Sequence, residues 1–133
     1  GNWVVGVADP DNNAEFVATA EVRDASVVTS GDYERYFEQD GKRYHHIFDP
    51  KTGYPADTGL RSVTVIDQNS TRADAMTTAL FVMGLDDGLA FCKENNIAAV
   101  FITSDKQIYP SDAVASACTY TFLGEEKGYT DAQ

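Results

Sequence analysis

The sequence predicts an α+β protein in which a mostly antiparallel sheet carries a pair of helices on one face. The first half of the chain alternates apolar and polar residues, which is typical of strands with one solvent-facing side. The middle of the chain changes to a helical period, and short strand-like segments follow it. With 133 residues, 43% of them hydrophobic, residues 1–133 are expected to form a single domain with one modest core.

Several segments have the alternation or the continuous apolar character of strands. In chain order, we expect strands at residues 3–7, 16–22, 25–29, 60–66, 98–103 and 107–109. Between the third and fourth of these, Asp40-Gly41 is a dipeptide favoured in type I′ turns, where the backbone needs positive φ. It predicts a hairpin in which residues 36–38 pair with residues 43–45.

Two helices are predicted in the middle of the chain. Apolar residues recur at helical spacing over residues 72–83, and Gly84 stands where a helix C-cap is expected. A second helix is expected over residues 86–94, whose first turn carries two aspartates. Residues 111–133 form a tail whose structure the sequence does not define, with a candidate strand at 119–123 and disorder expected in the last ten residues.

Composition excludes several classes of function. A net charge of −11 disfavours nucleic acid as a partner, since phosphate contacts need clustered lysine and arginine. No apolar run approaches the roughly 20 residues of a membrane-spanning helix. Cys92 and Cys118 lack the spacing of a zinc site, and the apolar neighbours of Cys92 predict a buried side chain.

One candidate site lies on the first predicted helix. Asp74 and Thr78 are four residues apart, so both project from one helix face, and their oxygens suit Mg²⁺ or Ca²⁺. A structural interpretation competes with the metal site: Thr71 and Asp74 have the spacing of a capping box. From spacing alone, the cap is the favoured interpretation and the metal site is the alternative.

Two further polar clusters follow strands. Residues 29–32 (Thr-Ser-Gly-Asp) end a strand in a turn whose N–H groups and hydroxyl suit an anion, although a plain turn explains them too. Residues 49–53 (Asp-Pro-Lys-Thr-Gly) leave the same choice, because the lysine and threonine suit a phosphate. Ahead of them, His45 or His46 is a candidate general base, the alternative being a histidine hydrogen-bonded to the turn.

Taken together and in order, four segments resemble the ApbE family. They are residues 29–35 (TSGDYER), 46–55 (HIFDPKTGYP), 62–65 (SVTV) and 73–79 (ADAMTTA). Members of this family are FAD:protein FMN transferases, long labelled thiamine-biosynthesis lipoproteins. The resemblance extends over about residues 3–110, in uninterrupted order.

The resemblance implies a specific reaction, in which FMN moves from FAD to a Thr or Ser hydroxyl of a target flavoprotein and AMP is released. It implies that Asp74 and Thr78 bind Mg²⁺, which reverses the preference for a cap, and that His46 is the catalytic histidine. The flavin and phosphate groups of FAD would be bound by the ends of two motifs. These cofactor-binding residues are Thr29, Ser30, Gly31, Asp49, Lys51, Thr52 and Gly53.

Family proteins are much longer than this chain, so the resemblance implies a C-terminal part whose missing N-terminal half supplies further flavin contacts and a metal ligand. We therefore expect the isolated chain to be incomplete and inactive. Two alternatives remain: a non-catalytic flavin-binding, metal-binding or structural fragment, and a pyrophosphatase that converts FAD to FMN and AMP. The family suggests an extracytoplasmic, membrane-anchored bacterial lipoprotein, but nothing in this chain itself gives a location.

Overall fold

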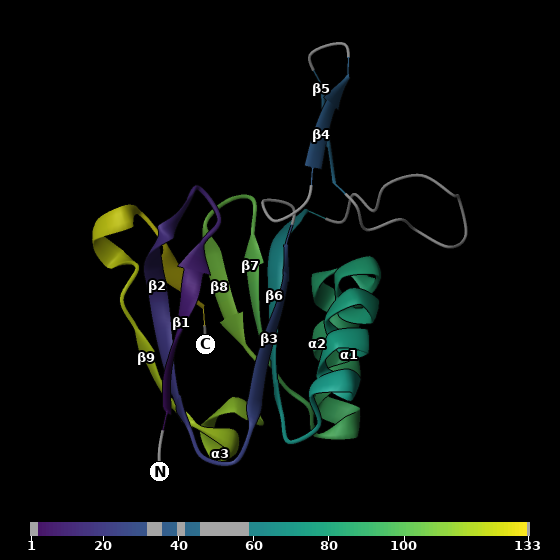
Figure 1. Ribbon diagram of the computed structural model, residues 1–133, viewed down its shortest axis with the longest axis vertical. Coiled ribbons are helices and arrows are strands. Elements are labelled where there is room, and N and C mark those ends of the chain that lie inside the picture. The colour runs from purple at the N-terminus through teal and green to yellow at the C-terminus, as the bar shows by residue number, and fades with distance from the viewer. Residues whose placement is uncertain (1–2, 32–35, 40–41, 46–58, 133) are drawn as a thin grey trace.

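The computed structural model describes residues 3–31, 36–39, 42–45 and 59–132, arranged in three layers (Figure 1). A five-stranded sheet lies between a helical pair and a three-stranded sheet, and a separate two-stranded hairpin projects from one end. The elements are, in chain order, β1 (Trp3–Asp9), β2 (Asn12–Val22), β3 (Ser26–Gly31), β4 (Tyr36–Gln39), β5 (Lys42–His45), β6 (Leu60–Asp67), α1 (Ser70–Met83), α2 (Leu85–Asn95), β7 (Ala98–Thr103), β8 (Gln107–Pro110), α3 (Val114–Ala117), β9 (Thr119–Phe122), the short 3₁₀ helix η1 (Glu125–Lys127) and β10 (Thr130–Asp131).

The five-stranded sheet has the order β10-β8-β7-β6-β3 and is antiparallel except for the short β10–β8 pair. Helices α1 and α2 cover one of its faces, as the sequence predicts (Figure 1). Strand β7 is buried along its whole length. Its side chains alternate between two cores, because the sheet is covered on both faces.

One core fills the space between the two sheets, and the other fills the space between the large sheet and the helices. The first contains Val7, Ala18, Ala20, Ile66, Val100, Ile102 and Ile108 among its buried members. The second contains Val63, Val65, Ala73, Leu80, Phe81, Ala99 and Phe101. Both cores are built mainly from apolar side chains, so removal of this surface from water is the main stabilising contribution in both.

The prediction of one sheet is incomplete, because β1, β2 and β9 form a second sheet in the order β1-β2-β9. The reason lies in the apolar residues on both faces of β7: one face is covered by the helices, and the other needs a second layer. Alternating side chains of β2 supply that layer, with Ala18, Ala20 and Val22 turned toward the large sheet. The strand positions themselves are predicted correctly to within a few residues.

Helix α1 begins differently from the capping-box prediction, which is wrong. Its N-cap is Asn69, whose side-chain oxygen accepts a hydrogen bond from the Arg72 amide at 3.0 Å. Thr71 lies inside the helix and is not at its start. The predicted C-cap is confirmed, because the Gly84 amide bonds the Leu80 carbonyl and its φ of 84° is a conformation that favours glycine.

The predicted hairpin is confirmed in its register. Tyr36 pairs with His45, Phe37 with Tyr44, and Glu38 with Arg43. This is the pairing that a two-residue turn at positions 40 and 41 requires, and those two residues lie outside the described part of the chain.

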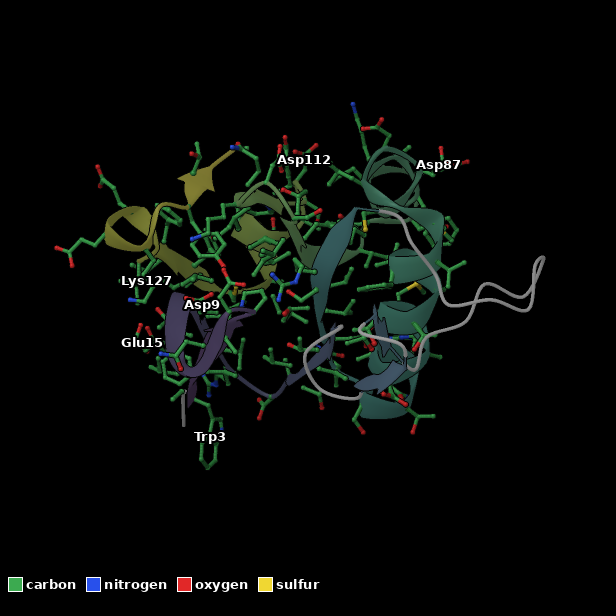
Figure 2. The ribbon with its side chains drawn as sticks, turned by 90° about the horizontal axis from the view of Figure 1, so that it is seen from above. Trp3, Asp9, Glu15, Asp87, Asp112 and Lys127 are labelled. Atoms are coloured by element: carbon green, nitrogen blue, oxygen red, sulfur yellow. The ribbon has the colours of Figure 1, made fainter. Side chains whose placement is uncertain are left out.

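The expectation of disorder in the last ten residues is wrong. Residues 124–132 form η1 and β10, and β10 pairs in parallel with β8. The Lys127 ammonium lies 3.5 Å from the Glu15 carboxylate of β2, on the side of the molecule away from the helices (Figure 2). Local composition gave no sign of this order, because it arises from contacts with residues distant in the chain.

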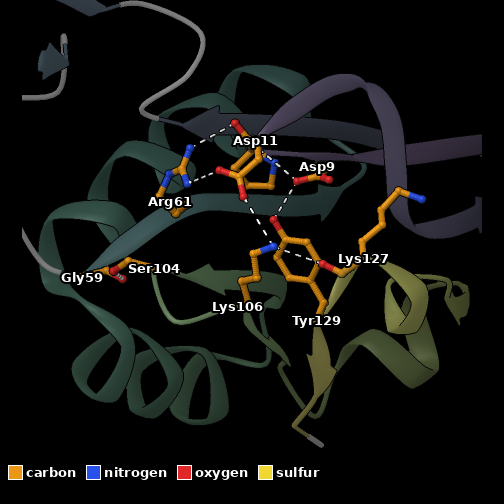
Figure 3. A network of polar contacts seen from close by, with 9 residues as sticks. Asp9, Asp11, Gly59, Arg61, Ser104, Lys106, Lys127 and Tyr129 are labelled. Atoms are coloured by element: carbon orange, nitrogen blue, oxygen red, sulfur yellow. Dashed lines mark hydrogen bonds and ion pairs between the residues drawn. The ribbon is translucent and has the colours of Figure 1, made fainter.

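A polar network joins this C-terminal segment to the β1–β2 turn (Figure 3). The Tyr129 hydroxyl donates to the Asp9 carboxylate at 2.6 Å, and the Asp11 amide donates to the same carboxylate at 2.9 Å. Arg61 of β6 donates to the Asp11 carboxylate at 2.8 Å, and the Lys106 ammonium lies 3.8 Å from it. The network thus ties the two sheets together at one edge.

Candidate functional site

The end of β3 meets the middle of α1 through a pair of hydroxyl groups. Ser30 Oγ lies 2.7 Å from Thr77 Oγ1, and both residues are buried. Thr77 Oγ1 also donates to the Asp74 carbonyl at 2.8 Å. Residues 29–31 of one polar cluster singled out in the sequence therefore lie next to the Asp74–Thr78 turn, which carries another.

Asp74 and Thr78 are exposed and stand one helical turn apart. They flank the buried Thr77, which turns inward against Ser30. A carboxylate and a hydroxyl on one face are hard oxygen ligands, and Mg²⁺ typically takes one or two protein carboxylates and completes its shell with water and phosphate oxygens. This donor set fits Mg²⁺. Within the described ranges, no group of three or more His, Cys, Asp or Glu residues gathers into a fuller metal site.

Thr29 and Gly31 differ from Ser30 in where they lie. Side chains alternate along β3, so the Thr29 hydroxyl is on the opposite face, 2.8 Å from the Thr64 hydroxyl. Gly31 is buried at the end of β3 and pairs with Ser62 of β6. Ser62 is itself buried, and its hydroxyl has no hydrogen-bond partner among the residues that the structure describes.

The remaining predicted site residues, His46, Asp49, Lys51, Thr52 and Gly53, lie outside the described residues. Gly59, which precedes β6 and follows this segment, is fixed by two hydrogen bonds. Both the amide and the hydroxyl of Ser104 donate to the Gly59 carbonyl at 2.8 Å (Figure 3). The β6 end of the segment is therefore fixed to the β7–β8 turn.

The sequence prediction did not include Thr77 or Ser62 as site residues. Each stands where the pattern calls for an apolar side chain: Thr77 four residues after buried Ala73, and Ser62 on a buried strand. A hydroxyl at a core position needs a partner. For Thr77, whose partner is Ser30, that requirement is the signal from which the residue was identifiable.

Burial lowers the reactivity of both cysteines. Burial raises the pKa of the Cys92 thiol to about 11, so this thiol is protonated at neutral pH and unreactive. Burial also raises the pKa of Cys118. The hydrogen bond from Arg72 lowers the pKa of Asp67, in an exposed ion pair at 2.7 Å near the start of α1.

A hollow of about 640 Å³ lies where α1 begins and α2 ends. Its walls include Asp67, Arg72 and Asn95. None of the residues that line it is Ser30, Asp74 or Thr78, so it is separate from the place where β3 meets α1. The hydrogen-bonded hydroxyls locate the candidate site better than this hollow does.

Comparison with known proteins identifies relatives of one kind. The sequence pattern of the ApbE family matches residues 1–101. A protein of Klebsiella pneumoniae named FAD:protein FMN transferase is 46% identical over 110 residues, covering 81% of this chain and 35% of the relative. A protein of the same name from Treponema pallidum is 47% identical over 114 residues, covering 84% and 32%. The chain thus spans about a third of the length of these curated relatives.

Solved structures agree with the sequence matches. The ApbE protein from Thermotoga maritima superposes with a TM-score of 0.79 at 40% identity, covering 87% of this chain and 38% of that one. The flavinyl transferase ApbE from Pseudomonas stutzeri, in its apo form, gives a TM-score of 0.69 at 38% identity, covering 86% and 36%. No helix in the described ranges is long and apolar enough to cross a membrane.

Proposed function

Because the chain belongs to the ApbE family, we propose that it forms the metal-binding and part of the FAD-binding site of a Mg²⁺-dependent FAD:protein FMN transferase. The observation that carries the proposal is the contact between Ser30 and Thr77. It sets the end of β3, proposed to bind FAD, against the helical turn that carries Asp74 and Thr78. The substrates are FAD and a flavoprotein with a Thr or Ser acceptor hydroxyl.

In the proposed reaction the acceptor oxygen attacks the phosphorus of the FMN part of FAD. A new P–O bond forms to the acceptor, and the bond from this phosphorus to the bridging oxygen breaks. The bridging oxygen leaves on the phosphate of AMP. His46 takes the proton of the acceptor hydroxyl, a contribution typically of about 10²–10⁴-fold in rate.

Asp74 and Thr78 would hold Mg²⁺, which when bound neutralises charge on the pyrophosphate. That matters in a chain of net charge −11, which otherwise repels an anionic substrate. Gly31, at the end of β3, and the segment containing Asp49, Lys51, Thr52 and Gly53 would position the phosphate and flavin groups. The Thr29 side chain is committed to Thr64 on the other face, so any contact of Thr29 with FAD would come from its backbone.

Titration calorimetry of FAD into the chain, with and without excess Mg²⁺, tests the binding site. We expect binding that strengthens with Mg²⁺ and that Asp74→Asn abolishes. Asp87→Asn is the matched control, because Asp87 is also an exposed aspartate on a helix but lies on α2, away from β3. FAD binding that Mg²⁺ does not strengthen, or that both variants weaken equally, would contradict the proposal.

The alternatives are separated by the products. With this chain in the context of a full-length family protein, an acceptor flavoprotein incubated with FAD and Mg²⁺ should gain the mass of FMN, with an equal amount of AMP released. Free FMN with AMP would instead show the pyrophosphatase, and absence of any AMP would show a non-catalytic fragment.

A further inference from the structure

The hydroxyl groups of Ser30 and Thr77 form a hydrogen-bonded chain that ends on the backbone of the proposed metal-binding turn. Ser30 Oγ and Thr77 Oγ1 are 2.7 Å apart, and Thr77 Oγ1 is 2.8 Å from the Asp74 carbonyl oxygen. Thr77 is fully buried and Ser30 is 7% exposed. Water therefore competes little for either bond.

The donor and acceptor of each of these two hydrogen bonds follow from counting the hydroxyl protons. A threonine hydroxyl has one proton to donate, and a carbonyl oxygen can only accept. The Thr77 proton is used on the Asp74 carbonyl. The bond between the two hydroxyls must then use the proton of Ser30, which points at Thr77.

We infer that Thr77 is a positioning residue that makes Ser30 a hydrogen-bond acceptor toward FAD and ties it to the backbone of Asp74. This inference rests on the proposed function. The Ser30 oxygen keeps lone-pair capacity but has no proton left for a phosphate oxygen. Ser30 therefore accepts from an N–H or O–H group of the ligand or of its bound water, contrary to the expectation that its hydroxyl donates to an anion.

The Ser30–Thr77 hydrogen bond also fixes the distance between the end of β3 and the helical turn that carries Asp74 and Thr78. Ser30 belongs to β3 and Asp74 to α1, two elements that pack against each other. Thr77 lies on α1 and bonds Ser30 of β3, so a shift of the helix along the strand would break that hydrogen bond. Asp74 and Thr78, on either side of Thr77 in the same helix, keep their distance from the end of β3 for the same reason.

The chain contains a matched comparison pair one residue earlier on the same strand. Thr29 Oγ1 and Thr64 Oγ1 are 2.8 Å apart on the opposite face of the sheet. This pair joins β3 to β6 and has no contact with α1 through these hydroxyls. If the Ser30–Thr77 hydrogen bond only stabilised the fold, its removal would have the same effect as removal of the Thr29–Thr64 hydrogen bond.

The first experiment uses the 133-residue chain and Mn²⁺ as a paramagnetic probe, followed by broadening of backbone amide signals in NMR spectra. The variants are Thr77→Val, which keeps shape and removes both bonds, Thr77→Ser, which keeps the hydroxyl, and Thr64→Val as the control. We expect Mn²⁺ affinity at Asp74 and Thr78 to fall at least about tenfold in Thr77→Val, the equivalent of about 1.4 kcal/mol. Thr77→Ser should restore it, and Thr64→Val should leave it unchanged.

Equal Mn²⁺ affinity in Thr77→Val and the unmodified chain would overturn the positioning role. So would equal losses in Thr77→Val and Thr64→Val, because the effect would then be one of general stability. If the unmodified chain shows no broadening at Asp74 or Thr78, the proposed metal site fails, and the positioning role is decided by the second experiment alone.

The second experiment needs no ligand. Slowly exchanging hydroxyl protons of Ser30 and Thr77 are followed by NMR in the unmodified chain, in Ser30→Ala and in Thr77→Val. The inferred direction of the hydrogen bonds requires that the Thr77 hydroxyl proton stays protected in Ser30→Ala, because its acceptor is the Asp74 carbonyl. It also requires that the Ser30 proton loses protection in Thr77→Val. Loss of Thr77 protection in Ser30→Ala would reverse the direction and overturn the inference.

Discussion

Replacement of Tyr129 by phenylalanine should lower the free energy of unfolding by about 2 kcal/mol, because it removes a hydrogen bond to a buried carboxylate. A hydrogen bond to a charged group contributes about 1.5–3 kcal/mol, and more is lost when the remaining partner stays buried. Asp9 is 6% exposed and Tyr129 is 4% exposed, so little water replaces the missing hydroxyl. Asp9 keeps the Asp11 amide as a donor, which limits the loss.

Urea unfolding followed by circular dichroism measures this effect, and thermal unfolding should show a decrease of about 6 °C in Tm, at about 3 °C per kcal/mol for a chain of this size. Tyr120→Phe is the matched control, because the Tyr120 hydroxyl is buried and has no hydrogen-bond partner among the described residues. Its removal should be neutral or slightly stabilising. Equal stability of Tyr129→Phe and the unmodified protein would refute the reasoning.

The decrease of the free energy of unfolding at alkaline pH gives a second test of the hydrogen bond between Tyr129 and Asp9. Burial, and then the hydrogen bond to Asp9, raise the pKa of Tyr129 above its usual value of 10.0. A raised pKa in the folded state means that the stabilisation is complete below pH 10 and decreases as the pH rises from there toward the folded-state pKa. Burial raises the pKa of Tyr120 in the same direction. Both variants should therefore weaken the alkaline loss of stability, while only Tyr129→Phe lowers stability at pH 7.

Three further predictions concern the helices and cysteines. Asn69→Ala should lower the free energy of unfolding by about 1 kcal/mol, because it removes the N-cap of α1, whereas Thr71→Ala should lower it much less. The reverse order in urea unfolding would support the capping box at Thr71 instead. Gly88→Ala should lower the free energy of unfolding by about 1 kcal/mol, because the new Cβ would lie 2.8 Å from the Phe101 ring. Overpacking costs about 1–3 kcal/mol, which exceeds the gain of about 1 kcal/mol in helix propensity. The loss caused by Gly88→Ala should be smaller in a Phe101→Leu background than in the unmodified protein, and a stabilised Gly88→Ala would contradict this account. In native protein at pH 8, Cys118 should react with a thiol reagent before Cys92, whose pKa of about 11 and burial protect it, as peptide mass spectrometry after labelling can show.

The sequence was sufficient for those parts of the fold that depend on local patterns. The helical period over residues 72–83 and Gly84 predicted α1 and its end. The Asp40-Gly41 dipeptide predicted the register of β4 and β5, because a two-residue turn leaves only one pairing. The family motifs led to the expectation that Ser30 and Asp74 belong to one site, and in the structure Ser30 bonds Thr77, three residues from Asp74 on α1.

Features that depend on long-range contacts were not predictable in this way. The C-terminal segment is ordered by Tyr129 and Asp9, which are 120 positions apart, and no local pattern records such a bond. The N-cap of α1 was misplaced because Asn69 and Thr71 are both suitable residues, and only the backbone conformation distinguishes them. Thr77 was passed over because its hydroxyl gains meaning only when Ser30 lies beside it.

The pairing of β3 with β6 has a consequence for how this protein can change over evolution. Gly31 and Ser62 are partners in one antiparallel ladder, so the chain leaves the sheet at one point and re-enters it beside that point. The ladder holds both ends together whatever the intervening length, and each doubling of the length of a flexible connection costs only about 0.6 kcal/mol in closure entropy. Insertions and deletions in the stretch that carries the His-Asp-Pro motif are therefore tolerable for folding.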